Sequence, residues 1–323
     1  MDKGRLELFI DNVQIIKDEF KWESILTKIF SAMIYSFNNK VIDCDAIRDS
    51  AEIIRKNSKA FSYFRGTSFF NIATMLSIRD ERDVIVKRAM KIYEMLKKIG
   101  FYSSFYLTVA AYQIAVNVED GRECEVVERA KEFFDGMKKE HRFLTGQDDY
   151  IFAAMIGISN IDIEYGLKTL KEIEGMLIQK LSYNNAVQSM SQILLLNEDT
   201  PATVNRLIEV HDLLNEKNYK VYSDNLIQLG ILSLVPEDPK SIVEEIIEVY
   251  DYLHNSKKFK WMMTKQQLLM LSMSFAAFDM LGGIKFEVAT AAISNNMINI
   301  MLAEQAVMAN IVSSSTIVVT SNN

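Results

Sequence analysis

The chain has 323 residues, of which 49% are hydrophobic and 24% are charged, values typical of a globular protein. Its formal net charge of −7 argues against general nucleic-acid binding. With only 12 Gly and 3 Pro residues, long irregular loops are not expected and helices are.

The cysteines and the apolar runs bear on the cellular compartment. Cys44 and Cys124 form no CxxC motif and no disulfide framework, which favours the reducing cytoplasm. Lys3 and Arg5 precede only the short run LELFI before Asp11, and this apolar core is too short for a signal peptide. No run reaches about eighteen apolar residues, so no transmembrane segment is expected.

In chain order, two amphipathic helices are expected first, at residues 2–20 and about 22–37. A four-part unit then repeats along the chain. It consists of a short, strongly apolar helix, an acidic turn, a longer amphipathic helix and a basic turn. The short helices are expected at 68–78, 105–118, 150–159, 186–196, 225–235 and 267–278, and the longer ones at 46–56, 83–99, 122–139, 163–181, 201–216 and 239–255.

The spacing of the longer helices indicates the architecture. An acid recurs in the later ones every 38 to 41 residues, at Glu94, Asp135, Glu174, Asp212 and Asp251. Two helices per unit of about 40 residues are typical of stacked hairpins, because one hairpin cannot bury its apolar helix alone. The sequence therefore predicts an all-α fold of stacked antiparallel helical hairpins, α-solenoid-like, with a closed α/α toroid as the alternative.

We expect one all-helical domain over residues 1–323, with a helix pair in 1–40, hairpin repeats in 41–279 and a capping helix with a tail in 280–323. Residues 286–312 predict a long helix rich in Ala, Met and Asn. This helix can close the end of the stack, or it can bind a partner or a second copy of the chain. Its many side-chain amides make it a poor membrane span.

The stretch HRFLTGQDDYIFAAMIG lies near the middle of the chain. One interpretation is a helix start, in which Thr145 or Asp148 caps the helix and the acids face the positive end of its dipole. The other is an acidic pair, Asp148 and Asp149, at the mouth of a pocket with His141 and Arg142 nearby.

The turns predict two oppositely charged edges. Short-to-long turns are acidic and long-to-short turns are basic, as at Lys257, Lys258 and Lys260. Favourable interactions with helix dipoles, about 0.3–1 kcal/mol each, account for such a pattern by themselves. Alternatively, the basic edge docks an acidic partner or lipid headgroups.

The sequence motifs of several enzyme classes are absent from the chain. The chain contains no GxxxxGK[ST], GxGxxG, HExxH or GxSxG, and its three histidines share no helical turn. Asp148 and Asp149 do not begin a DDxxD motif, because position 152 is Phe. We therefore expect no metal and no cofactor, and we lean against an enzyme.

The chain resembles an uncharacterised bacterial family of all-helical proteins of unknown function. The resemblance rests on FKWE (20–23), FSYFRG (61–66), HRFLTGQDDY (141–150) and the Ala/Met/Asn-rich C-terminal helix, and it spans nearly the whole chain. It implies no activity. The loop residues that it singles out are Arg65, Gly66, Thr145, Gly146, Asp148 and Asp149.

Arg65 and the two acids each precede an expected apolar helix, so we predict that they form a polar cluster on one edge. Three functions remain open. The first is a cytoplasmic binding or adaptor protein for a protein or peptide. The second is an α/α-toroid enzyme or small-molecule binder with an acidic pocket near Asp148 and Asp149. The third is a structural protein that self-associates through its C-terminal helix.

Overall fold

The computed structural model describes residues 1–181, 184–196, 200–259, 262–281, 293 and 296. All regular elements in these residues are helical, namely α1 to α14 and three short 3-10 turns, and there is no strand among them. The expected all-α class is therefore confirmed. The helix expected at 286–312 lies outside the described residues, apart from Ile293 and Asn296.

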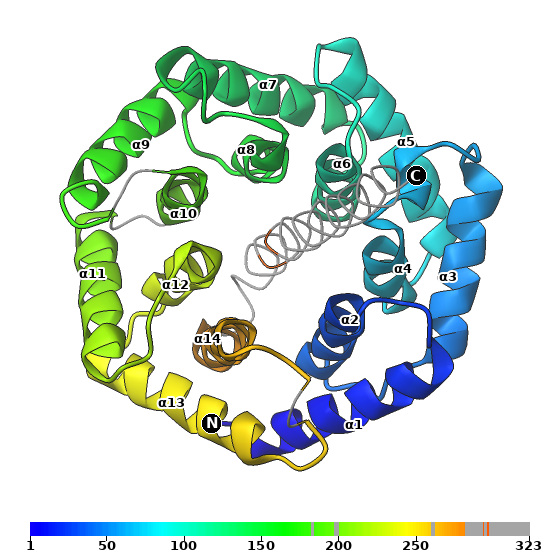
Figure 1. The fold of residues 1–323 in the computed structure, drawn as a ribbon. Coiled ribbons are helices and arrows are strands. Elements are labelled where there is room, and N and C mark those ends of the chain that lie inside the picture. The colour runs from blue at the N-terminus through cyan, green and yellow to red at the C-terminus, as the bar shows by residue number, and fades with distance from the viewer. Residues whose placement is uncertain (182–183, 197–199, 260–261, 282–292, 294–295, 297–323) are drawn as a thin grey trace, which may run out of the picture.

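The helices form two concentric layers, with odd-numbered helices outside and even-numbered helices inside (Figure 1). Each outer helix packs against the inner helix that follows it. The outer helices are α1 (Lys3–Glu19), α3 (Cys44–Asn57), α5 (Arg82–Lys98), α7 (Glu123–Glu140), α9 (Ile163–Leu177), α11 (Thr200–Glu216) and α13 (Pro239–Asn255). The inner helices are α2 (Ile25–Phe37), α4 (Phe69–Ser77), α6 (Phe105–Asn117), α8 (Tyr150–Ile158), α10 (Asn185–Leu195), α12 (Leu226–Ser233) and α14 (Lys265–Leu281).

Burial explains why the two layers have different compositions. The outer helix α5 buries one stripe, which includes Val86, Ala89 and Ile92, and leaves its other face to solvent. The inner helix α8 is buried from Tyr150 through Gly157, because outer helices cover one side and the ring interior covers the other. The short apolar helices of the sequence are thus the inner layer.

The ring is closed, so of the two arrangements considered the toroid is observed and the open stack is not. Phe9 of α1 meets Phe275 of α14 at 5.0 Å between ring centroids, and Phe37 of α2 stacks on Phe278 at 4.1 Å. The amino group of Met1 pairs with Glu245 at 2.7 Å. These contacts bury aromatic surface that an open stack would expose at both ends.

Hydrogen bonds join neighbouring inner helices at a separation of about one hairpin. Ser31 of α2 bonds Thr74 of α4 at 2.8 Å between hydroxyl oxygens, 43 residues apart. Further along the ring, Ser68 bonds Thr108 at 2.8 Å, 40 residues apart. Buried hydroxyls therefore satisfy one another across the inner layer, and polar side chains are tolerated there at little cost.

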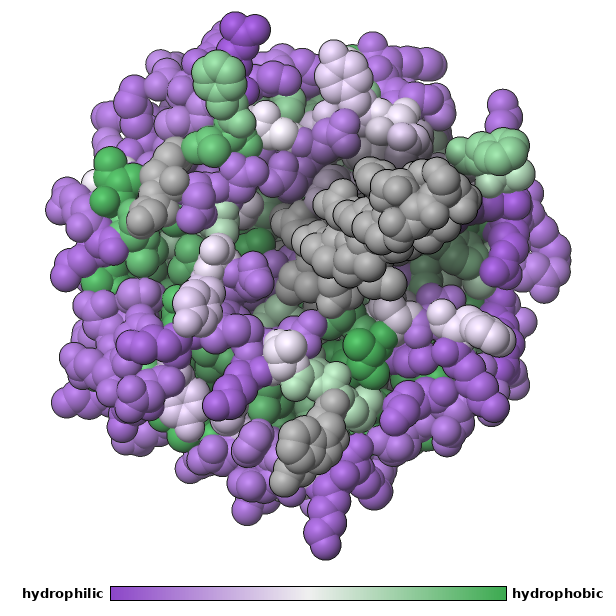
Figure 2. All heavy atoms as spheres, viewed as in Figure 1, coloured by the Kyte–Doolittle hydropathy of each residue, from purple (hydrophilic) through white to green (hydrophobic). Residues whose placement is uncertain are grey.

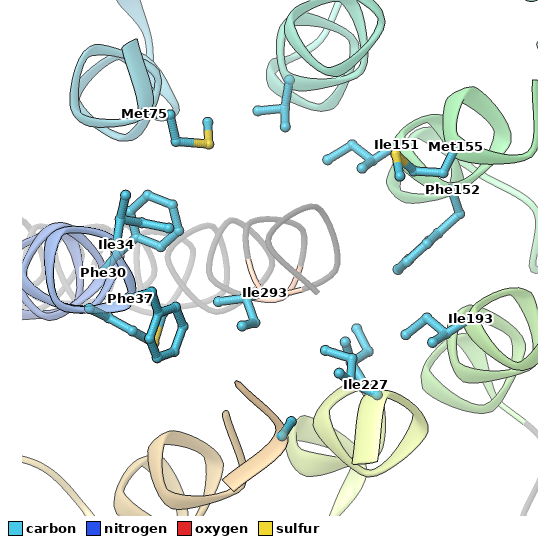
Figure 3. Packing of buried hydrophobic residues seen from close by; sticks show 14 of the residues in the cluster. Phe30, Ile34, Phe37, Met75, Ile151, Phe152, Met155, Ile193, Ile227 and Ile293 are labelled. Carbon is cyan, nitrogen blue, oxygen red and sulfur yellow. The ribbon is translucent and has the colours of Figure 1, made fainter. Parts of the chain in front are cut away.

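The ring interior is apolar, as Figure 3 shows. Phe30 and Phe37 of α2, Phe152 of α8 and Ile227 of α12 point towards its middle, where Ile293 also lies. Ile293 is only 2% exposed. Residues of the chain's own C-terminal part therefore contribute to the filling of the ring.

Most expected helix boundaries agree with the structure, with two corrections. The second helix begins at Ile25 rather than near Trp22, because the Ser24 hydroxyl caps it by accepting from the Thr27 amide at 3.1 Å. The helix expected at 163–181 ends at Leu177 and continues as turns.

Candidate functional site

The turn before α8 brings Gly146 and Asp149 together. Gln147–Asp149 form a 3-10 turn, and the Gly146 amide donates to Asp149 Oδ2 at 2.8 Å. This is one half of a capping box, in which a side chain reaches back to a free backbone donor. Capping of α8 by Thr145 or Asp148 was therefore wrong: the residue before this helix is Asp149, whose side chain accepts from Gly146 and not from an amide of α8.

Two hydrogen bonds tie this turn to the neighbouring inner helix α10. Gln192 Nε2 donates to Asp149 Oδ1 at 2.6 Å, and Gln188 Nε2 donates to Thr145 Oγ1 at 2.9 Å. The partners are 43 residues apart in both bonds, so both follow the hairpin spacing. The Asn185 amide lies 3.5 Å from Asp148 Oδ2.

Burial changes the acidity of this cluster. Asp149 is 1% exposed, and burial together with the neighbouring Asp148 carboxylate raises its pKa from 3.8 to about 7. Burial also raises the pKa of Asp148. The pKa of Tyr106 in α6 rises through burial first and through the two acids second. Tyr106, Asp148 and Asp149 therefore form one electrostatically coupled group.

His141 lies on the outer side of the same turn. Its Nε2 lies 2.7 Å from Glu174 Oε2, and Glu174 is a buried side chain of α9. The contact connects the end of α7 to the next outer helix. His141 thus holds the turn to the outer layer, while Asp149 holds it to the inner layer.

Arg65 belongs to a different turn. It ends the 3-10 turn Tyr63–Arg65, and its guanidinium donates to Ser58 Oγ at 2.9 Å and to the Arg55 carbonyl. Its described hydrogen bonds thus stay within its own loop and the end of α3. The turns before α4 and α8 both pack against α6, and the expected cluster of Arg65 with the two acids remains a prediction.

Gly66 is required by close packing. A Cβ at this position would lie 2.0 Å from Cε1 of Phe105, the first residue of α6. No side chain fits there unless the aromatic ring moves. The FRG motif therefore sets how closely this loop approaches α6.

The three candidate lysines differ in their surroundings. Lys257 is exposed. Lys258 Nζ lies 2.9 Å from Asp11 Oδ1, so this ion pair spans the ring closure between α13 and α1. Lys260 lies outside the described residues.

Sequence reasoning missed two features. The first is a second turn of the same design before α12, where the Tyr222 amide donates to Asn225 Oδ1 at 3.4 Å and Asn225 Nδ2 donates to the Gln266 carbonyl at 3.1 Å. The shared pattern of a polar pair before an apolar helix, DDYI and DNLI, was the available signal.

The second missed feature is Asn296. Its amide is 3% exposed and donates to the Asp224 carbonyl and to Gln228 Oε1, both at 2.9 Å. It also lies 3.5 Å from the Met270 sulfur. The wall of the ring therefore recognises a side-chain amide next to the buried Ile293.

The described part of the chain has neither a metal-ligand cluster nor a membrane-spanning helix. No three His, Cys, Asp or Glu side chains there come together as metal ligands. Among the same residues, no helix has both the length and the apolar content needed to cross a bilayer.

The comparisons with known proteins are sparse. No curated protein and no solved structure matches the chain significantly. One family model, described as "Protein of unknown function (DUF4003)", matches residues 12–307 and so spans almost the whole ring. The chain belongs to this family, whose description gives no activity.

Proposed function

We propose that the protein is a binding protein that holds an apolar polypeptide segment with side-chain amides inside its ring. The observation that carries this proposal is the environment of Ile293 and Asn296. Ile293 is 2% exposed among Phe, Ile and Met side chains, and Asn296 donates to Gln228 and Asp224. Full burial of an Ile side chain is worth about 1.5–3 kcal/mol, and a hydrogen bond about 1 kcal/mol.

In this proposal Ile293 and Asn296 belong to a resident occupant supplied by the chain itself. A partner segment of similar chemistry competes with it, so the protein acts as an adaptor whose ring is closed until the partner arrives. An occupant on the same chain has an effective concentration in the millimolar range, which sets a high threshold for competitors. Free thiols at Cys44 and Cys124 support a reducing compartment such as the cytoplasm.

The experiment is a binding titration in the full-length chain. Ile293→Asp should displace the resident segment, because a carboxylate would be buried among apolar groups. A labelled peptide with the native sequence of residues 286–312 should then bind this variant at least about tenfold more tightly than the wild type. Ile178→Asp is the matched control, because Ile178 is 54% exposed.

Two results would refute the proposal. One is an Ile293→Asp variant that keeps its circular dichroism spectrum but does not bind the peptide. The other is equal binding by all three proteins.

A second candidate is a small-molecule site that uses Asp149 as an acid or base. It is favoured by the raised pKa of about 7 beside Tyr106 and Asp148. Against it, both Asp149 oxygens already accept hydrogen bonds from Gly146 and Gln192. A small molecule that co-purifies with the wild type but not with Asp149→Asn would favour this candidate over the first.

Self-association through the C-terminal part is the third possibility. In the present proposal Ile293 and Asn296 lie in the ring of their own chain, so the chain should be a monomer. After deletion of residues 286–323, the solution mass should be that of one truncated chain, so both forms should be monomers. A wild-type dimer that becomes a monomer on deletion would instead support a structural protein that self-associates through its C-terminal part.

A further inference from the structure

The connections between helices fall on two opposite rims of the ring. In Figure 1 the inner helices are seen end-on and the outer helices run around them. Hydrogen bonds join the starts of neighbouring inner helices, as between Ser68 and Thr108, Thr145 and Gln188, and Asn225 and the Gln266 carbonyl. The outer-to-inner connections lead into these starts and so lie on one rim, whereas the inner-to-outer connections leave the other ends and lie on the opposite rim. By sequence, each of the outer-to-inner connections contains at least one Trp, Tyr or Phe, and none of the inner-to-outer connections does. Within the connections, aromatic residues are therefore confined to one rim.

Five of these connections have at least one aromatic side chain that is exposed to solvent. Trp22, Phe61 and Phe143, from three separate connections, are 100%, 102% and 98% exposed. Tyr102 and Tyr222, from two more, are 69% and 57% exposed. We call these five residues the aromatic rim. Such side chains add nothing to the core, and their repetition around one rim distinguishes them from scattered exposed hydrophobics.

Figure 2 shows one face of the ring, with hydrophilic side chains over most of its margin. Single apolar side chains protrude from this margin beside α7 and beside α3. They stand apart from one another on this face.

Charge divides between the rims in the same way. The outer-to-inner connections contain ten Lys and Arg residues against four Asp and Glu, and the inner-to-outer connections contain three against ten. Lys59, Lys180, Lys217 and Lys257 are exposed members of the basic set. The molecule is therefore polarised along the ring axis, although its net charge is −7. Within a Debye length, about 8–10 Å, a surface facing the aromatic rim meets mainly positive charge.

We propose that the aromatic rim docks the protein on an anionic lipid bilayer. Aromatic side chains prefer the headgroup level, and lysines beside an anionic leaflet add attraction. A flat surface can take all of the separate aromatic side chains at once, whereas a bound peptide would need one continuous groove. The opposite, acidic rim then faces the solvent. This inference is independent of what the ring interior binds.

The test uses the full-length protein and sedimenting vesicles, either phosphatidylcholine alone or phosphatidylcholine with phosphatidylserine. The wild type should bind the mixed vesicles, bind the neutral ones far more weakly, and detach as salt is raised. The triple variant Trp22→Ser, Phe61→Ser, Phe143→Ser should bind the mixed vesicles about tenfold or more weakly. These side chains are fully exposed, so the fold should be unaffected.

A matched variant on the other rim supplies the control. This triple variant removes three side chains that are 63%, 58% and 63% exposed, by the substitutions Val41→Ser, Val84→Ser and Tyr165→Ser. Its vesicle binding should stay within about twofold of the wild type, because these positions face away from the bilayer. A charge-reversal variant should bind the mixed vesicles at least as weakly as the aromatic triple variant. It carries the substitutions Lys59→Glu, Lys180→Glu, Lys217→Glu and Lys257→Glu.

Three outcomes would overturn the proposal. The wild type could fail to bind the mixed vesicles at low salt. The two triple variants could bind them equally well. Finally, the aromatic variant could lose a protein partner while vesicle binding stays unchanged, which would make the rim a protein-docking surface.

Discussion

The turns that precede α8 and α12 have the same design but different chemistry. In both, a side chain accepts a hydrogen bond from the amide three residues earlier, at Gly146 or Tyr222, and also bonds the following inner helix. The first turn uses Asp149 and the second uses the neutral Asn225. Both turns therefore use a buried polar side chain. Only the first turn uses a carboxyl group for this purpose.

Removal of the shared side chain should have the largest effect. Asp149→Ala and Asn225→Ala each delete the two hydrogen bonds of a buried side chain and leave their partners unpaired. Each should lower the free energy of unfolding by about 2–4 kcal/mol. Urea denaturation measures both. A loss below about 0.5 kcal/mol at either position would show that the two turns do not share this design.

Replacement of the neutral side chain of the second turn by the acid of the first should have the next largest effect on the free energy of unfolding. Asn225→Asp replaces the amide that donates to the Gln266 carbonyl with a buried carboxylate. We expect a loss of about 1–3 kcal/mol at pH 8 and a smaller loss at pH 5, because burial favours the protonated form. A loss that is independent of pH would contradict this account.

The reverse exchange, Asp149→Asn, sharpens the comparison through pH. Because burial raises the pKa of Asp149 from 3.8 to about 7, the folded state binds a proton that the unfolded state releases. The stability contributed by this group is fully present below about pH 4 and is lost as pH rises through 7. Asp149→Asn should remove that dependence and be more stable than the wild type at pH 8, by on the order of 1 kcal/mol.

The asparagine can keep both contacts of Asp149. Gln192 Oε1 is buried and has no hydrogen-bond partner among the described residues, so rotation of the Gln192 amide would let this oxygen accept from the new Asn side chain. Thermal melts from pH 4 to pH 8 test the prediction. Parallel pH profiles for the variant and the wild type would show that Asp149 does not titrate in this range.

Loss of the bond unique to the first turn should have the smallest effect. Thr145 accepts from Gln188, whereas Val221 stands at the matching position, four residues before Asn225. Thr145→Val should therefore cost only about 1 kcal/mol. Loss of folding in this variant would mean that the Gln188 contact organises the first turn far more than the comparison implies.

The sequence predicted the short and the long helices well, but it gave ring closure only as the alternative to an open stack. Apolar residues on most sides of a short helix indicate cover from several neighbours, so the inner helices could be recognised from composition alone. Phe9 and Phe275 are ordinary core residues in sequence. Nothing local tells that they meet 266 residues apart, because closure depends on the summed rotation of every hairpin.

The stretch around Asp148 and Asp149 was predicted in outline but not in detail. It does begin a buried helix, as one of the two interpretations expected, whereas the pocket of the other interpretation remains a prediction. The capping residue and the bonds to Gln188 and Gln192 could not be foreseen, since they depend on a 3-10 turn and on a helix about 43 residues away. Asn296 gave no signal at all, because one amide among many in that region does not indicate its partner.

The most direct test of the binding proposal is a double-mutant cycle between ring and peptide. The ring protein is full-length Ile293→Asp, with or without Gln228→Ala, and the peptide of residues 286–312 carries Asn296 or Ala in its place. If the peptide occupies the ring interior, the two changes should couple by about 0.5–1.5 kcal/mol, as expected for one buried hydrogen bond. Effects that add within about 0.3 kcal/mol would place the peptide elsewhere and contradict the account.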